Sequence, residues 1–266
     1  MRARSSRLVP FFCAPLLAMG LALASAHAAD KKEEKKPEPP RVTAALPLAL
    51  KTGTTNKIVV RGLNLTNVTE LHFTNDAVKA VIVLGKKTKA EVPKESDAKK
   101  VGDTQIGAEI FLPADSLAGT NWFTLTSPEG VSEPRPLVFL PPADLIEEKE
   151  PNGGFREAQV WPIGQTMTAT IKEAGDVDVF RFAGTAGQSI RLEVFAAAAG
   201  SALDSLITLY DDQGRVLASN DDAYGQRDSR LELKLRATGP HYISVMDAND
   251  KAGPTHVYLL RLTVRE

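Results

Sequence analysis

The chain has 266 residues, of which 43% are hydrophobic, and its formal net charge is −1. This length is enough for two ordinary domains with cores of their own. Because a nearly neutral chain has no large basic field, we expect no nucleic-acid partner.

The first 28 residues have the pattern of a secretory signal peptide. Three arginines precede the apolar run LVPFFCAPLLAMGLALA, and SAHAAD then supplies the small residues of a cleavage site before Ala29. A membrane anchor is the alternative, but the run is short for a span and ends in small residues. We expect export to the periplasm, the cell surface or the exterior, with no membrane span after cleavage. Cys13 is the only cysteine and lies in this segment, so the mature chain has no thiol for catalysis or metal binding.

Residues 29–41 are expected to form a charged linker. The stretch DKKEEKKPEPP combines lysine, glutamate and proline and has no apolar residue to bury. Such a composition favours an extended, solvated tether.

Residues 42–140 are predicted to form a first β domain. Short runs rich in β-branched and aromatic residues alternate with clusters of Gly, Asn, Asp and Pro, as strands and turns do. The expected strands are 57–62, 69–73, 79–85, 106–112, 122–127 and 136–140. The lysine-rich residues 86–103 are interpreted as a long exposed loop.

Two stretches of this domain resemble the IPT/TIG type of immunoglobulin-like domain. They are LALKTGTTNKIVVRGLNLTNVTELHF and LPADSLAGTNWFTLTSPEGVSEPRPLVF. The residues that carry the likeness are Gly62, Asn64, Leu65, Gly119, Pro128, Gly130 and Ser132. The resemblance implies an Ig-like sandwich that serves as a spacer or interaction module and brings no catalytic residues.

After an inter-domain linker at 141–147, residues 148–266 are predicted to form a second sandwich. Apolar residues alternate with charged ones, which indicates antiparallel strands with one wet face per sheet. The expected inward sets are Ile190, Leu192 and Val194; Leu231, Leu233 and Leu235; and Tyr258, Leu260, Leu262 and Val264. YDDQGRV is predicted to be a hairpin turn around Gly214.

The order of motifs in this half resembles the bacterial pre-peptidase C-terminal domain. The motifs are EKEPNGGFREAQ, GDVDVFRFAGTAGQSIRLEV, SALDSLITLYDDQGRVLASNDDAYGQRDSRLELKL and GPHYISVMDANDKAGPTHVYLLRL. The resemblance implies a non-catalytic, jelly-roll-like β-sandwich of an exported protein. It also implies calcium near the start of the domain, since collagen-binding relatives hold calcium there.

A candidate calcium site follows from that resemblance. Its candidate ligands are Glu148, Glu150, Asn152, Asp176 and Asp178. Calcium prefers carboxylate and amide oxygens, and residues i, i+2 and i+4 of an extended segment point to one side. The relatives often place a further acid where this chain has Gly153. The alternatives are a solvated acidic linker and aspartates that only cap a turn.

A second acidic cluster is a candidate ion site as well. It contains Asp221, Asp222 and Asp228. Asx-turns, in which the side chain accepts a hydrogen bond from nearby backbone, are the favoured alternative.

The sequence as a whole predicts an all-β, non-enzymatic protein of two sandwiches. The expected function is binding or scaffolding toward an extracytoplasmic protein, peptide or polysaccharide, with calcium as a structural ion. Alternatives are a carbohydrate-binding module, which needs an exposed flat row of aromatic rings, and a secretion or folding aid for a partner peptidase. A secreted hydrolase is the least favoured, because the three remaining histidines are scattered and no G-x-S-x-G motif occurs. The oligomeric state is left open.

Overall fold

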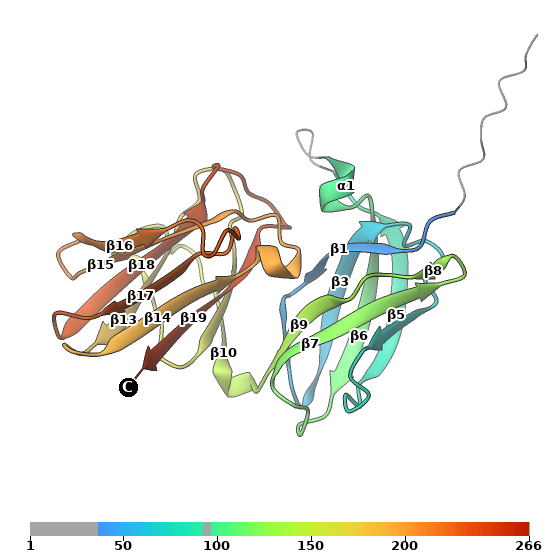
Figure 1. Ribbon diagram of the computed structural model, residues 1–266, viewed down its shortest axis with the longest axis horizontal. Coiled ribbons are helices and arrows are strands. Elements are labelled where there is room, and N and C mark those ends of the chain that lie inside the picture. The colour runs from blue at the N-terminus through green and yellow to red at the C-terminus, as the bar shows by residue number, and fades with distance from the viewer. Residues whose placement is uncertain (1–36, 93–96, 266) are drawn as a thin grey trace, which may run out of the picture. The chain divides into compact units, whose positions relative to one another are not determined.

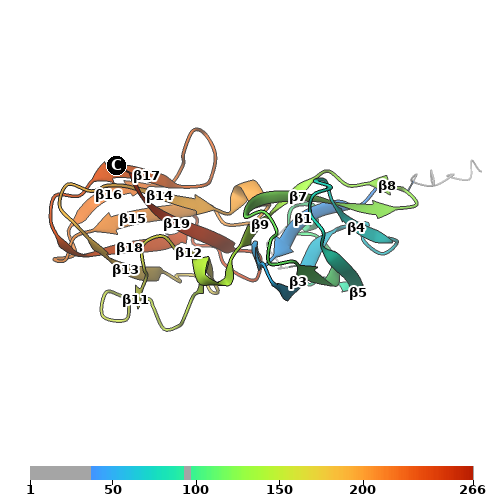
Figure 2. The ribbon, with the colours of Figure 1, turned by 90° about the horizontal axis from the view of Figure 1, so that it is seen from below.

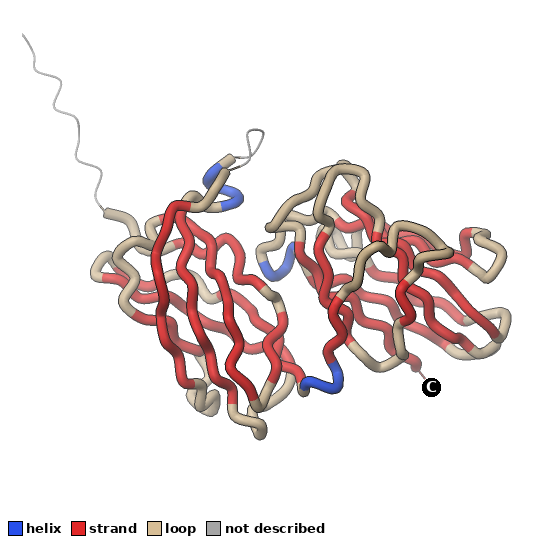
Figure 3. Tube along the Cα trace, turned by 180° about the vertical axis from the view of Figure 1, so that it is seen from behind, coloured by secondary structure: helices blue, strands red, loops and turns tan. Residues whose placement is uncertain are grey.

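The computed structural model describes residues 37–92 and 97–265. The predicted signal peptide and residues 29–36 of the predicted linker lie outside the described residues. Strands dominate the described chain, and helix is confined to one short α-helix and two 3₁₀ turns (Figure 3). The all-β prediction is confirmed. Within 37–92 and 97–265, no helix is both long enough and apolar enough to cross a membrane.

The first sandwich consists of two sheets whose strands are mostly antiparallel (Figure 1). One sheet has the order β1-β3-β6-β5, and the other has the order β2-β9-β7-β4, with β8 paired to β7. The bounds are β1 (Arg41–Leu46), β2 (Ala49–Lys51), β3 (Thr54–Leu63), β4 (Glu70–Phe73), β5 (Val81–Lys89), β6 (Thr104–Leu112), β7 (Gly119–Ser127), β8 (Gly130–Val131) and β9 (Arg135–Leu140).

Alternation along the strands builds the core of this sandwich. In β6 every second residue from Ile106 to Leu112 is buried, and Phe123 and Leu125 of β7 face them from the other sheet. Phe73 packs edge-on against both Phe123 and Phe139. Each of the six predicted strands overlaps an observed one, whereas the short strands β1, β2 and β8 are missed.

The prediction of one exposed loop over residues 86–103 is wrong at both ends. Strand β5 continues to Lys89 across a bulge between Leu84 and Lys87, and helix α1 spans Ala98–Val101. β5 is an edge strand whose outer positions are exposed, so it tolerates lysines that would break a central strand. The bulge also removes the regular alternation by which a strand is recognised.

The second sandwich has two five-stranded sheets, with orders β10-β12-β19-β14-β17 and β11-β13-β18-β15-β16 (Figure 2). The bounds are β10 (Leu145–Glu147), β11 (Gln159–Val160), β12 (Thr166–Thr170), β13 (Asp178–Gly184), β14 (Ser189–Phe195), β15 (Ser205–Tyr210), β16 (Val216–Asn220), β17 (Arg230–Lys234), β18 (Gly239–Asp247) and β19 (Val257–Arg265).

The core of the second sandwich confirms most of the predicted inward set. Residues of both sheets meet in one buried cluster that includes Trp161, Phe180 and Leu192. Val264, near the end of β19, is the exception, because it is exposed. The predicted hairpin joins β15 to β16, and Gly214 adopts the positive φ of 75° that its turn requires.

One side of the second sandwich is closed by the start of its own chain. β10 pairs in parallel with β12 at the edge of one sheet, and β11 pairs in parallel with β13 at the edge of the other. Residues 148–158 run from one edge to the other. β10 falls inside the predicted linker 141–147, and β1 begins at the last residue of the predicted linker 29–41. β10 has only three residues, and β1 buries four consecutive residues, so neither shows a period of two in the sequence.

Candidate functional site

The acidic segment 148–152 lies where the chain passes between the two sheets of the second sandwich. Ligand oxygens of Glu148, Glu150 and Asp178 all lie within 4.8 Å of one another. Two oxygens bound to one calcium ion at about 2.3–2.6 Å are at most about 5 Å apart. The three carboxylates therefore have the spacing of a cation site, and they form the sole such group in the part of the chain that the structure describes.

Glu148 and Glu150 are held by short contacts. Glu148, whose side chain is only 6% exposed, accepts hydrogen bonds from the backbone N–H of Thr170 at 3.3 Å and from Nδ2 of Asn152 at 3.3 Å. Glu150 accepts the backbone N–H of Asn152 at 3.1 Å. Nζ of Lys172 lies 3.0 Å from Glu148 and 2.7 Å from Glu150, so an ammonium group bridges the two glutamates.

Asn152 and Asp178 are completely buried, and each has an oxygen without a partner. The backbone carbonyl of Asn152 accepts the N–H of Val179, which ties the acidic segment to β13. Oδ1 of Asn152 and Oδ1 of Asp178 have no hydrogen-bond partner among residues 37–92 and 97–265. Buried polar atoms are almost always satisfied in folded proteins, so these two oxygens are available to accept from a further group.

The environment of Asp178 disfavours its ionised form. Burial raises the pKa of its carboxyl, and the neighbouring carboxylate of Glu148 raises it further. The hydroxyl of Tyr258 donates a 2.5 Å hydrogen bond to Oδ2 of Asp178, which opposes this rise. The pKa of Tyr258 is itself raised, by burial first and then by the charge of Asp178. A carboxylate in such a place is stabilised by a positive ion.

Lys172 is affected in the opposite direction by the same cluster. Burial lowers the pKa of its ammonium group, but hydrogen bonds to Glu150 and Glu148 and their charges outweigh this and raise the pKa. Lys172 and Tyr258 are the two functional residues that sequence reasoning missed. Tyr258 was recognised as core, but nothing in the sequence indicates which carboxylate its hydroxyl meets.

Asp176 stands apart from the other four predicted ligands. Its carboxylate accepts the backbone N–H of Lys172 at 2.7 Å and so closes the turn before β13. It is not part of the group of converging carboxylates. The turn-capping alternative describes Asp176, whereas Asp178, two residues later, points into the cluster.

In the second acidic cluster, Asp228 accepts hydrogen bonds from backbone N–H groups. The carboxylate of Asp228 accepts the backbone N–H groups of Ala196, Ala197 and Ala198 at 2.6–3.1 Å. Asp221 and Asp222 are exposed, and the structure does not bring them together with Asp228 as converging ligands within the described residues. The oxygens of Asp228 are thus occupied by backbone donors.

Comparison with known proteins identifies part of the second sandwich. Residues 176–246 match the family model described as "Bacterial pre-peptidase C-terminal domain". This part of the second sandwich is therefore similar to that family of domains. The match includes Asp178 and begins after the acidic segment 148–152.

A longer protein also aligns with part of this chain. The chain is 35% identical over 150 residues to a protein of Deinococcus radiodurans described as "Probable subtilase-type serine protease". That alignment covers 55% of this chain and 19% of the relative, so the chain spans about a fifth of the relative's length.

Two solved structures align with parts of this chain. The pre-peptidase C-terminal domain of a collagenase from Bacillus anthracis aligns with a TM-score of 0.34 at 18% identity, covering 44% of this chain and all of that domain. SGBP-B from a xyloglucan utilization locus of Bacteroides uniformis aligns with a TM-score of 0.27 at 12% identity, covering 86% of this chain and 74% of that protein.

An aromatic cluster lies on the outer face of the β13-β18-β15 sheet, a few residues beyond the acidic segment. Phe155 packs against Tyr210 and Tyr242, with ring centroids 5.1 Å and 4.9 Å apart and interplanar angles of 72° and 55°. Exposed Arg181 pairs with Tyr242 in the strand register. The rings are tilted and do not form the flat row that a carbohydrate-binding module needs. Tyr224 is 86% exposed and lies under the guanidinium of Arg230.

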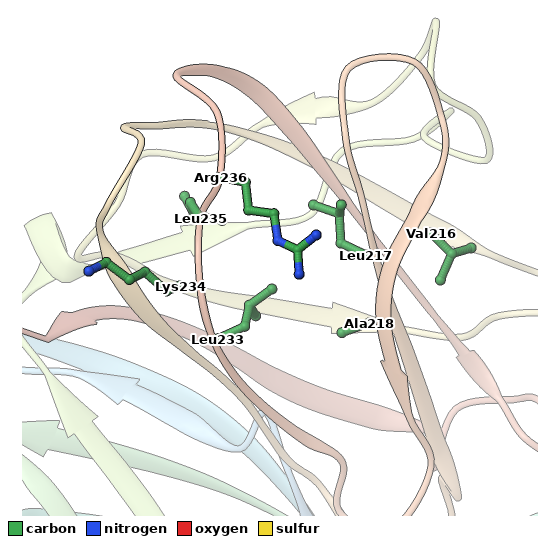
Figure 4. A pocket seen from close by; sticks show the side chains of 7 residues that line it. All are labelled: Val216, Leu217, Ala218, Leu233, Lys234, Leu235 and Arg236. Carbon is green, nitrogen blue, oxygen red and sulfur yellow. The ribbon is translucent and has the colours of Figure 1, made fainter.

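A groove of about 560 Å³ lies between the edge strands β16 and β17 of the second sandwich. Its lining is mostly apolar, with Leu217 and Leu233 from opposite strands. The guanidinium of Arg236 reaches between the strands toward Leu217, while Lys234 points away (Figure 4). Residues 221–229 connect these two edge strands at one end, and the groove lies along the rest of this side.

Proposed function

We propose that this protein is an exported, non-catalytic binding module whose second sandwich is stabilised by calcium. The observation that carries the proposal is the cluster of three carboxylates with two orphaned buried oxygens at residues 148–152 and 178. Glu148, Glu150, Asp178 and the amide oxygen of Asn152 would hold the ion. Rotation of the amide exchanges its oxygen and nitrogen, so either can face the carboxylates. Calcium would supply positive charge and cross-link the segment to β13.

The ion site supports a binding surface nearby. Phe155 follows Asn152 by three residues, and it lies over Tyr210 and Tyr242. An ion that fixes residues 148–152 would also fix the loop that carries Phe155. Tilted aromatic rings beside the exposed Arg181 suit an extracytoplasmic protein or peptide better than a flat sugar ring, because they offer both apolar area and a charged donor. The first sandwich, in this proposal, is an IPT/TIG-like spacer or interaction module.

Thermal unfolding tests the calcium part of this proposal. The protein is melted in chelator and in increasing calcium, beside the variants Glu150→Gln and Glu157→Gln, which remove equal charge at and away from the site. Calcium at about 100 times its Kd should stabilise the native state by about 2.7 kcal/mol, and only Glu150→Gln should weaken this effect. An unchanged midpoint up to millimolar calcium would overturn the site.

Binding arrays test the proposed binding surface around Phe155. The wild-type protein and Phe155→Ala are applied to matrix proteins and to glycans, with and without calcium. Binding to a protein or peptide that calcium strengthens and Phe155→Ala abolishes supports the proposal. Binding to glycans alone, or binding that Phe155→Ala leaves unchanged, contradicts it.

A further inference from the structure

We propose that Lys172 is a tethered counter-ion that occupies the acidic site until calcium displaces it. This inference rests on the calcium site proposed above and adds how that site is regulated. Nζ of Lys172 lies 3.0 Å from Oε2 of Glu148 and 2.7 Å from Oε1 of Glu150. Those are two of the three carboxylates that converge within 4.8 Å. The ammonium group and a calcium ion would therefore compete for the same two glutamates.

The backbone of Lys172 is fixed independently of its side chain. Its N–H donates to Oδ2 of Asp176 at 2.7 Å, in the turn between β12 and β13. The side chain is 50% exposed, so its charged end has a route to water. A lysine stem is long and flexible, and its ammonium group is readily hydrated. Lys172 can thus leave the glutamates without any change in the strands that position them.

Charge balance explains why a cation stabilises this arrangement. Glu148 and Glu150 lie close to each other and to the buried Asp178, and a positive charge offsets the repulsion between the ionised carboxylates. Lys172 supplies one positive charge from within the chain, and calcium would supply two. The lysine therefore keeps the acidic segment in place without calcium, and it also lowers calcium affinity, because the ion must compete with it.

Calcium titration of a charge-neutral variant tests the competition. Lys172→Gln keeps most of the side-chain length and removes the charge. Lys149→Gln is the matched control, since Lys149 is an exposed lysine within the same acidic segment. By isothermal titration calorimetry, Lys172→Gln should bind calcium at least tenfold more tightly than wild type. Lys149→Gln should stay within about twofold of wild type, as expected for a screened surface charge.

Without calcium, we expect the Lys172→Gln substitution to destabilise the protein, although it strengthens calcium binding. In chelator, Lys172→Gln should melt below wild type, because the carboxylates lose their counter-ion, whereas Lys149→Gln should melt close to wild type. Calcium should then raise the midpoint of Lys172→Gln by more than it raises that of wild type. Calcium binding by Lys172→Gln that is equal to or weaker than wild type overturns the counter-ion role while leaving the calcium site standing.

A measurement on the unsubstituted lysine covers the case in which Lys172→Gln does not fold. Lysines are reductively methylated with ¹³C, and the methyl resonance of Lys172 is followed by NMR during the calcium titration. If Lys172 is released, its methyl resonance should shift toward the chemical shift of solvated lysines. The midpoint of this shift should coincide with the midpoint of calcium binding. A resonance that stays in place while calcium binds overturns the proposal. Failure of both wild type and Lys172→Gln to bind calcium overturns the calcium site and this inference together.

Discussion

The hydroxyl of Tyr258 and the carboxylate of Asp178 share a 2.5 Å hydrogen bond inside the second sandwich. Tyr258 belongs to β19 of one sheet and Asp178 to β13 of the other. The bond therefore links the two sheets through a fully buried polar pair. Glu148 also lies beside Asp178, so the acidic segment is next to this linked pair.

Removing this hydroxyl should destabilise the protein. Tyr258→Phe leaves Asp178 buried without its donor, and an unsatisfied buried acceptor costs about 1–3 kcal/mol. Urea unfolding followed by far-UV circular dichroism measures the loss. Tyr224→Phe is the control, since its side chain is exposed and should change stability by less than about 0.5 kcal/mol. Equal stability of the two variants would contradict a structural role for the pair.

Substitution of the two aspartates of GDVD, Asp176 and Asp178, should change the effect of calcium on stability differently. Asp178→Asn removes a converging carboxylate and should abolish most of the rise in melting temperature with calcium. Asp176→Asn removes a turn acceptor that lies outside the cluster, so it should lower the midpoint in chelator and calcium alike. Differential scanning fluorimetry with and without calcium measures both. A lost calcium response in Asp176→Asn alone would reverse the assignment.

Asp228 should matter for stability independently of any ion. Asp228→Asn weakens the acceptor for the three N–H groups of residues 196–198, and we expect a loss of about 1–3 kcal/mol, since these bonds are charge-assisted. Asp222→Asn, at an exposed position of the same loop, is the control. Chemical unfolding in chelator and in calcium should give the same differences. A calcium-dependent loss in Asp222→Asn would instead revive the second ion site.

Acid should destabilise the protein through His256. This side chain is buried, and burial lowers the pKa of its imidazole; Asp247, 4.0 Å away, opposes this, while Lys251 and Arg227 add to it. The unfolded chain, with a histidine pKa of about 6.5, then binds more protons than the native state as the pH falls. The contribution of His256 to stability is complete above about pH 6.5 and is lost as the pH falls below it.

A histidine substitution isolates this effect. His256→Gln cannot be protonated, so its free energy of unfolding should fall less between pH 7 and pH 5 than that of wild type. His72→Gln, at an exposed position in β4, should keep the wild-type dependence. Urea midpoints at a series of pH values decide the matter. Parallel curves for wild type and His256→Gln would exclude His256 as the source.

The sequence allowed the fold class to be predicted because period-two alternation is strong in the long strands. Ile190, Leu192 and Val194 face the core as expected, since both neighbours of β14 hold it in register. β10 and β11 could not be predicted, because two or three residues show no period. Their pairing depends on the fold that the longer strands build.

The candidate site was predicted in part for a similar reason. The spacing of Glu148, Glu150 and Asn152 is local, so an extended segment places them on one side. The difference between Asp176 and Asp178 depends on where the turn ends and β13 begins, which a D-x-D pattern does not fix. Lys172 was missed because the meeting of β12 with the acidic segment is a property of the tertiary fold.

The two sides of the second sandwich differ in a way that sets its order of unfolding. On one side, residues 148–158 span both sheets and carry the acidic cluster; on the other, residues 221–229 connect β16 to β17, and a groove lies between these edge strands. Under mechanical load or during a slow thermal fluctuation, the sheets should part first on the β16/β17 side, because the groove leaves these two strands less closely packed. Amide hydrogen exchange would then be fast in these strands and slow in β12 and β13.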